Sequence, residues 1–276
     1  MREEYLSRVP EWYRSFEKFD VVLSDDLDGI VSTSALKFAK NWNVEYFYDF
    51  SKLYVTGKTY FKENKNATRV WADVAITRRE MTFDNHISRK NLGDKLNDLC
   101  INPNVITNVT NENYYDKYCG SSALLIWSLY NIPLPETELG KMLLLCIDST
   151  FKGFFGYNNF KERNRFYLCD VLGFEELYEV EKRHSREEFY ELISKYNLNA
   201  KTTIDKDGYL HTDLDLDFIG KELGIELSIP TDKCFIEWRA LEEHKVNNFY
   251  GDVASIKRLI TLAYTGKNFV KYSTMA

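Results

Sequence analysis

The sequence predicts an α/β fold, with a parallel-sheet domain and a smaller, mainly helical C-terminal region. Short apolar runs with strand character recur through the first half of the chain, and helical segments follow several of them. This alternation is typical of parallel sheets, whose neighbouring strands need a connection that crosses the sheet. Beyond about Phe160 the pattern changes mainly to short helices. We therefore expect two domains, covering residues 1–185 and 186–276.

Four apolar runs in the first half each predict a strand. The first, Asp20–Leu23, leads into the acidic turn SDDLDG and then into the helical segment STSALKFAKNW. The next three predicted strands are Val44–Tyr48, Arg69–Val74 and Met81–Phe83. Open parallel sheets place their functional sites at the carboxyl ends of the strands, so the acids that end these runs are candidate site residues.

The segments that follow are predicted mainly as helices and loops. ISRKNLGDKLNDL has helical character, the Asn-rich stretch Asn102–Asn113 is a loop by composition, and Gly120-Ser121-Ser122 opens an apolar helix. A second helix, Pro135–Ile147, runs directly into Asp148. The remaining predicted elements are a turn at Asp205–Gly208, a helix opened by the acids of DLDLDF, and a final helix at Val253–Tyr264.

Composition places the chain among ordinary folded proteins and argues against several classes. Of its 276 residues, 44% are hydrophobic and 28% are charged, which allows a sizeable core. No apolar stretch reaches the roughly 18 residues of a membrane helix, and the N-terminus carries charges where a signal peptide would be apolar. We expect a cytoplasmic protein with no membrane partner.

The cysteines and the net charge limit the chemistry further. The five cysteines are widely spaced and never form a CxxC pair, so neither a disulfide framework nor a thiolate zinc site is expected. The formal charge of -6 argues against a general affinity for duplex DNA, because binding through overall charge needs a basic surface. Short nucleic acid substrates are favoured over long duplexes.

Aspartates follow apolar runs in four separate segments, and this arrangement indicates a metal site. The four are Asp28, Asp73, Asp84 and Asp148. An acidic turn on its own is a weak signal, because an aspartate there often only caps the next helix. Several carboxylates at one sheet edge would repel one another, and a divalent cation is the usual way to offset that repulsion.

The same segments resemble the motifs of the DHH phosphoesterases, especially the RecJ-like branch, over roughly residues 20–155. VVLSDDLDGIVSTSALKFA resembles the first motif, VWADVAI the second, TFDNHIS the Asp-His-His motif and CIDSTF the fourth. GSSALLIWSLYNIPLP is similar to the family's helix between the third and fourth motifs. The resemblance implies a metal-dependent phosphoesterase that uses a metal-activated water.

The resemblance also implies roles for individual residues. Asp73 would bridge two metal ions, Asp84 would support the neighbouring histidine, and His86 would face the scissile phosphate. Mixed carboxylate and imidazole ligation suits Mn²⁺, with Mg²⁺ as the alternative, bound as one or two ions. The implied metal ligands are Asp26, Asp28, Asp73, Asn85 and Asp148.

The chain departs from the family pattern in several places. Ser24 stands where the family usually has His or Asp, and Asn85, an uncharged and poorer ligand, replaces the first histidine of the triplet. Asn85 follows Asp73 by only twelve positions, which leaves no room for a helical crossover. The C-terminal region lacks the glycine-rich GGGH segment of the family's substrate-binding domain, so the resemblance does not imply a particular substrate.

Other polar residues near these motifs are candidates for substrate binding. Arg78 and Arg79 could clamp a phosphate, and the backbone N–H groups of Ser121 and Ser122 could hold an anion. The remaining histidines lie in polar surroundings and are expected at the surface; they are His184, His211 and His244.

The leading prediction is hydrolysis of a phosphodiester in a nucleotide, a short oligonucleotide or single-stranded nucleic acid. Two alternatives stay open. Ser24 and Asn85 are the substitutions expected of a catalytically degenerate DHH scaffold with a binding or structural role. DLDG alone also resembles the first motif of haloacid-dehalogenase-like phosphatases, with Asp26 as nucleophile and Asp28 as acid/base; that fold would need a later lysine and an acidic pair. The sequence predicts no oligomeric state.

Overall fold

The computed structural model describes residues 1–61, 68–157, 159–249 and 253–276 of the chain. Its strands are β1 (Asp20–Ser24), β2 (Asn43–Tyr48), β3 (Lys52–Thr56), β4 (Arg69–Ala72), β5 (Met81–Phe83), β6 (Cys100–Ile101), β7 (Thr202–Ile204), β8 (Leu210–Thr212), β9 (Phe235–Asn247), β10 (Leu259–Gly266) and β11 (Phe269–Met275). Its α-helices are α1 (Glu3–Leu6), α2 (Leu27–Lys40), α3 (Gly57–Tyr60), α4 (Pro103–Ile106), α5 (Ser122–Leu129), α6 (Glu138–Cys146), α7 (Phe160–Arg165), α8 (Glu175–Arg183), α9 (Arg186–Lys195) and α10 (Leu216–Leu223). Shorter or irregular helical segments are η1 (Glu11–Arg14), η2 (Tyr114–Asp116), η3 (Ile147–Gly153), η4 (Phe166–Leu172) and η5 (Val253–Ser255).

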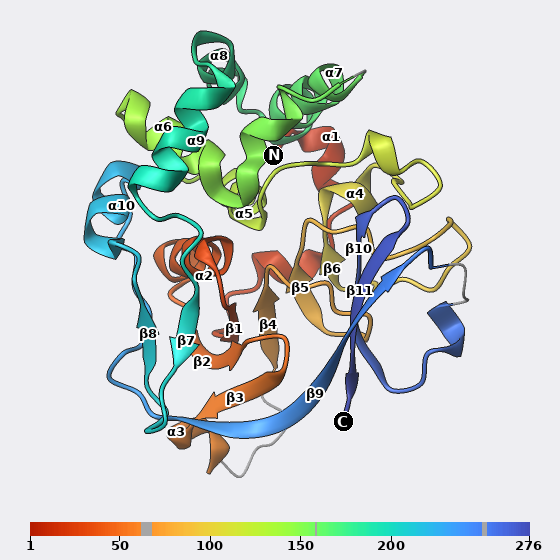
Figure 1. The fold of residues 1–276 in the computed structure, drawn as a ribbon, viewed down its shortest axis with the longest axis vertical. Coiled ribbons are helices and arrows are strands. Elements are labelled where there is room, and N and C mark those ends of the chain that lie inside the picture. The colour runs from red at the N-terminus through yellow and green to blue at the C-terminus, as the bar shows by residue number, and fades with distance from the viewer. Residues whose placement is uncertain (62–67, 158, 250–252) are drawn as a thin grey trace.

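One large mixed sheet organises the described part of the chain. Its spatial order is β10-β11-β9-β3-β2-β1-β4-β5-β6, and β7 and β8 form a separate hairpin (Figure 1). The strands β2, β1, β4, β5 and β6 pair in parallel, whereas β3, β9, β11 and β10 join through antiparallel pairs. The α/β prediction is confirmed, and the expectation of a purely parallel sheet is wrong.

The hairpin from β2 to β3 is the reason that the sheet becomes mixed. The side chain of Asp49 accepts hydrogen bonds from the backbone N–H groups of Ser51 (2.9 Å) and Lys52 (2.6 Å), which stabilises a tight turn. A tight turn reverses the chain and so creates an antiparallel neighbour. The long β9 then pairs with β3 and continues the antiparallel half.

The antiparallel half curls back over the carboxyl ends of β4 and β5. In Figure 1, β9 curves across the lower part of the view and leads to β10 and β11 at its right-hand side. The edge strand β10 returns to the parallel half, where Leu262 N–H donates to Ala75 (3.0 Å) and Tyr264 N–H donates to Ile87 (2.8 Å). The C-terminal strands therefore lie against the segments that follow β4 and β5.

Side-chain alternation along β1 shows how this curl covers the sheet. Val21 and Leu23 belong to the large core shared with the helices, whereas Val22 packs in a second cluster with Leu241 of β9 and Ile260 of β10. The second face of the parallel strands is thus covered by strands of the same sheet. Helices normally cover that face in doubly wound folds.

The C-terminal region contains more strand than the sequence predicted. Residues 186–276 hold α9 and α10 but also β7 to β11, and β9 pairs with β3. The main sheet therefore draws strands from both sides of the predicted domain boundary at residue 185. The helix predicted at 253–264 is wrong, because much of that segment forms the strand β10. β-Branched and aromatic residues suit a strand, and β10 contains Ile260, Thr261, Tyr264 and Thr265.

A second predicted helix, in ISRKNLGDKLNDL, is also absent from the described residues. The side chain of Asp94 accepts hydrogen bonds from the N–H groups of Lys90 (2.7 Å) and Asn91 (3.1 Å), so local side-chain bonds replace the helical ones. The predicted helices at α5, α6 and α10 and the turn at Asp205–Gly208 are confirmed. Within the described ranges, no helix is long and apolar enough to cross a membrane.

Candidate functional site

The candidate site lies where the parallel sheet changes winding direction. From β1 the chain passes through α2 to β2 on one side, and β4 then pairs with β1 on the other side. Connections leave β1 and β4 in opposite directions, which opens a crevice at the carboxyl ends of these two strands. Asp26 and Asp28 follow β1, and Asp73 follows β4 directly.

The turn after β1 packs tightly. Asp26 caps α2 by accepting the Gly29 N–H at 3.2 Å. A Cβ at Gly29 would lie only 2.1 Å from Ser24 Oγ and 2.8 Å from the Ser24 carbonyl oxygen, so the close approach of helix and strand requires glycine. Ser24 itself is fully buried, and its hydroxyl has no hydrogen-bond partner among the described residues.

Asp28 joins the first turn of α2 to the start of α5. Its carboxylate accepts hydrogen bonds from the backbone N–H groups of Ser122 and Ala123, both at 2.8 Å, and from Ser32 Oγ at 3.1 Å. The side chain is almost completely buried, with 3% exposure. Asp28 therefore neutralises the N-terminus of α5 and holds two segments that are far apart in the sequence.

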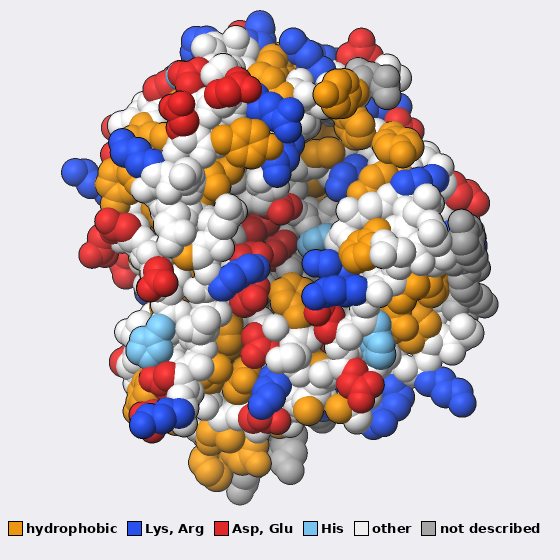
Figure 2. All heavy atoms as spheres, in the orientation of Figure 1, with side chains coloured by type: hydrophobic (Ala, Val, Ile, Leu, Met, Phe, Trp, Pro, Cys, Tyr) orange, Lys and Arg blue, Asp and Glu red, His pale blue; other side chains and the backbone are white. Residues whose placement is uncertain are grey.

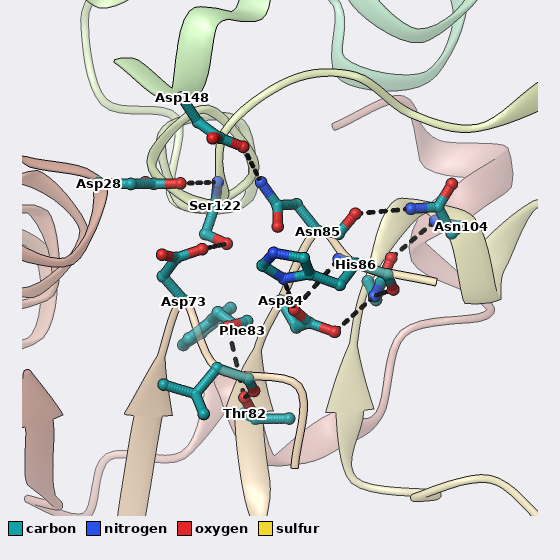
Figure 3. Close-up of polar contacts among 12 residues, drawn as sticks. Asp28, Asp73, Thr82, Phe83, Asp84, Asn85, His86, Asn104, Ser122 and Asp148 are labelled. Carbon is teal, nitrogen blue, oxygen red and sulfur yellow. Dashed lines mark hydrogen bonds and ion pairs between the residues drawn. The ribbon is translucent and has the colours of Figure 1, made fainter. Parts of the chain in front are cut away.

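Asp73 and Asp148 both adopt the left-handed backbone conformation that disfavours ordinary side chains. Their φ values are 60° and 48°, and Ser149 continues the second bend at 55°. Asp73 accepts a hydrogen bond from Ser122 Oγ at 2.9 Å, and Asp148 accepts one from Asn85 Nδ2 at 2.8 Å (Figure 3). These bonds offset backbone strain of about 1–2 kcal/mol per residue, and they turn both carboxylates toward one space.

The segment after β5 supplies a fixed histidine. Asp84 is completely buried and accepts hydrogen bonds from both the N–H of His86 (3.1 Å) and Asn102 Nδ2 (2.9 Å). Its Oδ1 also lies 2.8 Å from His86 Nδ1, as Figure 3 shows. With Nδ1–H donating to Asp84, the other ring nitrogen of His86 faces the crevice, where it accepts a hydrogen bond in the neutral ring and donates one in the protonated ring.

Asn85 contacts the cluster through its amide nitrogen. Nδ2 donates to Asp148 and to the carbonyl oxygen of Gly120 at 3.0 Å. The side chain is 7% exposed, and Oδ1 has no hydrogen-bond partner among the described residues. In Figure 3 this oxygen points into the space among Asp73, Ser122 and His86.

Burial and mutual repulsion raise the pKa values of three aspartates. Burial first, and then the charges of Asp148 and Asp26, raise the pKa of Asp28 to about 7. Burial and the charge of Asp28 raise the pKa of Asp73 well above its ordinary range, and burial also raises the pKa of Asp148. The site therefore tolerates several negative charges poorly, and a cation would relieve that cost.

Burial lowers the pKa of His86, but the hydrogen bond and charge of Asp84 outweigh it. The net effect is a raised pKa, so the ring keeps its second proton, and with it a positive charge, to higher pH than a free histidine does.

Two cavities open beside this cluster. The acidic cavity, of about 250 Å³, is lined by Asp26, Asp73, Lys201, Lys271 and Tyr272, among others. The basic cavity, of about 380 Å³, is lined by Asn85, Lys117, Gly120, Lys152 and Tyr264, among others. The two cavities share His86, Asp148 and Thr265. Figure 2 shows acidic side chains in a central hollow of this face, with basic side chains and a histidine beside them.

The structure brings most of the predicted site residues together but gives some of them other partners. Five of these residues line one or both cavities: Asp26, Asp73, Asn85, His86 and Asp148. In the described part of the chain, however, no three His, Cys, Asp or Glu side chains already stand in a metal-binding arrangement. The carboxylates converge on one neighbourhood without forming a ready-made coordination sphere.

The anion-binding role predicted for Ser121 and Ser122 is wrong. Their backbone N–H groups donate to Thr150 Oγ1 (3.1 Å) and to Asp28, so neither N–H is open to a ligand. Ser122 Oγ is also occupied, because it donates to Asp73. The two serines organise the carboxylates instead of contacting a substrate.

The two arginines lie away from both cavities. Arg78 Nε donates to the carbonyl oxygen of Leu259 at 3.2 Å, and Arg79 pairs with Asp98 at 3.0 Å near the surface. The loop that carries them bridges to β10, so it bends toward the C-terminal strands. This loop is also the shortened crossover that the sequence spacing requires, because it connects the parallel strands β4 and β5 without a helix.

No family model, curated protein or solved structure matches this chain. The resemblance to DHH phosphoesterases therefore stays a prediction, and the site has to be interpreted from its own geometry.

Four site lysines were not predicted from the sequence. They line the cavities and are Lys117, Lys152, Lys201 and Lys271. Lys152 follows Asp148 by only four positions, whereas the other three lie far along the chain from the aspartate motifs. Lys201 pairs with Asp25 (2.9 Å) and Asp26 (3.2 Å). A lone lysine in a polar segment carries no sequence signal of this kind, because its role depends on which distant segment packs beside it.

Proposed function

We propose that this chain is a metal-dependent phosphoester hydrolase that acts on a nucleotide, a short oligonucleotide or single-stranded nucleic acid. One observation carries the proposal. Aspartates from separate segments meet at the carboxyl edge of β1 and β4, opposite a histidine that Asp84 holds, in a cleft with lysines on its walls. The sequence resemblance to DHH phosphoesterases supports the same activity.

The donor set suits a hard divalent cation such as Mn²⁺ or Mg²⁺. Carboxylate oxygens of Asp73, Asp148 and Asp26 would hold it, and Asn85 Oδ1 is a buried oxygen that still lacks a partner. Asp28 is implied as a ligand by the resemblance, although its oxygens already accept three hydrogen bonds. When bound, the cation would activate a water and neutralise charge on the phosphoryl oxygens.

The protein's own groups would bind the substrate and handle the protons. Hydrolysis forms a bond from the water oxygen to phosphorus and breaks the phosphorus–oxygen ester bond, so the departing alkoxide needs a proton. His86 can supply it, because its pKa is raised and Asp84 fixes its orientation. The proton lost by the attacking water passes to solvent. Lys271, at the wall of the acidic cavity, would attract the anionic substrate.

A substrate screen with and without metal tests the proposal. The purified protein with Mn²⁺ should cleave bis-p-nitrophenyl phosphate or a short oligonucleotide, and EDTA should stop the reaction. Asp73→Asn should reduce kcat by at least 100-fold, whereas Asp98→Asn, which changes an exposed aspartate, should act like the wild type. Activity that survives Asp73→Asn would contradict the proposal.

A binding role without hydrolysis is the second candidate, and the hydrogen bonds of Asp28 favour it. A carboxylate that already accepts three bonds serves the fold, which leaves fewer groups for metal ions. The same screen separates the two candidates. Nucleotide binding by calorimetry, without turnover on linear and cyclic substrates in Mn²⁺ or Mg²⁺, would support the binding role.

The phosphatase alternative has one favourable feature, the ion pair from Lys201 to Asp26. In that mechanism Asp26 would attack the phosphorus and carry the phosphoryl group. Protein-bound phosphate after an acid quench, present in the wild type and lost in Asp26→Asn, would replace our proposal with that mechanism.

A further inference from the structure

The acidic cluster has open space on two sides. The acidic cavity and the basic cavity meet at His86, Asp148 and Thr265, which line both. A ligand whose reacting phosphate lies beside His86 can therefore extend into either cavity. A phosphodiester links two organic groups through one phosphate, and the two cavities provide a separate binding site for each group.

Two lysines of the basic cavity have no carboxylate partner among the described residues. The ammonium of Lys117 lies over the ring of Tyr114 at 5.2 Å, and that of Lys152 lies over the ring of Tyr190 at 5.7 Å. By contrast, Lys201 in the acidic cavity is held by two aspartates. Lys117 also makes a side-chain hydrogen bond to Tyr114. Because a ring or a phenol compensates an ammonium less well than an oxyanion does, the two lysines favour an anionic ligand.

The same cavity contains an unpartnered buried acceptor. Asn85 lines it, is 7% exposed, and keeps Oδ1 without a hydrogen-bond partner in the described part of the chain. Figure 3 shows this oxygen on the side of Asp73, Ser122 and His86, so it belongs with the donors of the proposed cation site. The groups of the basic cavity that remain for a ligand are therefore the two lysines.

On the basis of the proposed function, we infer that Lys117 and Lys152 bind a second phosphate group of the substrate, next to the phosphodiester that is cleaved. The substrate is then a short oligonucleotide with a terminal phosphate. Each lysine contributes a charge-assisted hydrogen bond of about 1.5 kcal/mol, which corresponds to roughly tenfold in affinity. A substrate with only the scissile phosphate leaves both lysines unused.

Calorimetric titration of three thymidine dinucleotides tests the inference without requiring turnover. The probes are TpT, pTpT with a 5′-phosphate and TpTp with a 3′-phosphate, each titrated in EDTA and in Ca²⁺. The wild type should bind one of the terminally phosphorylated probes about 100-fold more tightly than TpT, because the two contributions multiply. Lys152→Gln should reduce this preference to about tenfold, and Lys117→Gln/Lys152→Gln should abolish it.

Lys195→Gln is the matched control. Its ammonium also lies over an aromatic ring, that of Tyr196 at 4.9 Å, but Lys195 lines neither cavity. This variant should keep the wild-type preference. Circular dichroism shows whether each variant folds, and Lys152→Gln changes an exposed side chain, so it keeps the test decisive if the double variant is unstable.

Two results would overturn the inference. One is a wild type that binds TpT and both phosphorylated probes equally or binds none of them, and the other is a preference that keeps its wild-type size in the lysine variants. The proposed function is judged separately by hydrolysis in Mn²⁺. A lysine-dependent preference in a protein that never hydrolyses phosphodiesters would support the subsite and refute the hydrolase.

Discussion

Asp28 should make the metal-free protein less stable as the pH rises. Its pKa is raised from 3.8 to about 7 in the folded protein. At pH values between 3.8 and about 7, Asp28 holds a proton in the folded state that it has lost in the unfolded state. The free energy of unfolding therefore falls as the pH increases. From pH 5 to pH 8 the loss from Asp28 alone is roughly 2–3 kcal/mol.

Urea denaturation in EDTA at pH 5, 6, 7 and 8 measures this loss when the wild type is compared with Asp28→Asn. The asparagine cannot ionise, and its amide group faces the N–H groups of Ser122 and Ala123, which costs roughly 1–3 kcal/mol at every pH. The amino group of Met1, whose pKa is lowered to about 6, acts in the opposite direction. Both proteins carry it, so it cancels in the difference.

The stability difference, wild type minus variant, should therefore fall between pH 5 and pH 8. Added Mn²⁺ should flatten the dependence in the wild type, because a bound cation favours the ionised carboxylates. A difference that stays constant with pH would refute the reasoning. It would mean that Asp28 is ionised throughout, with no cost from burial or from its acidic neighbours.

Three further changes test other parts of the structure. Asn85→His should tighten Mn²⁺ binding, because imidazole is a stronger ligand than an amide, and equal affinities in calorimetry would exclude position 85 as a ligand. Gly29→Ala should lower the unfolding free energy by roughly 1–3 kcal/mol, since its Cβ would overlap Ser24 Oγ; an unchanged urea midpoint would contradict the tight turn. Ser185→Ala should cost about 1 kcal/mol, because the capping box with Glu188 is lost, and Ser185→Thr, which keeps a hydroxyl cap, should retain most of the stability.

Much of the parallel half could be predicted from local sequence patterns. The runs around Val22, Val70 and Phe83 became β1, β4 and β5, and the acids directly after them lie at one edge of the sheet. This succeeded because parallel strands always bring their carboxyl ends to the same edge. The contact of Asp84 with His86 was implied by the family resemblance, and it forms between residues only two positions apart.

The antiparallel half was not predictable in the same way. The strand β10 was expected to be a helix, and its place is decided by pairing with β11 and by bridges to Ile76 and Ile87. These partners are long distances away in the sequence, so periodicity within β10 carries no information about them. Tertiary pairing overrides local preference in such segments.

By itself, the sequence determined which acids follow strands and therefore which edge of the sheet they share. Only the tertiary structure decided how each acid is used and which lysines lie near the acids. Asp28 binds the start of α5, Ser122 Oγ donates to Asp73, and Lys117 and Lys152 line a second cavity without a carboxylate partner among the described residues. The physical reason is the distance along the chain over which each property is determined. Strand polarity is a property of the local chain, whereas hydrogen-bond partners, desolvation and charge pairing depend on which distant segments become neighbours when the sheet curls.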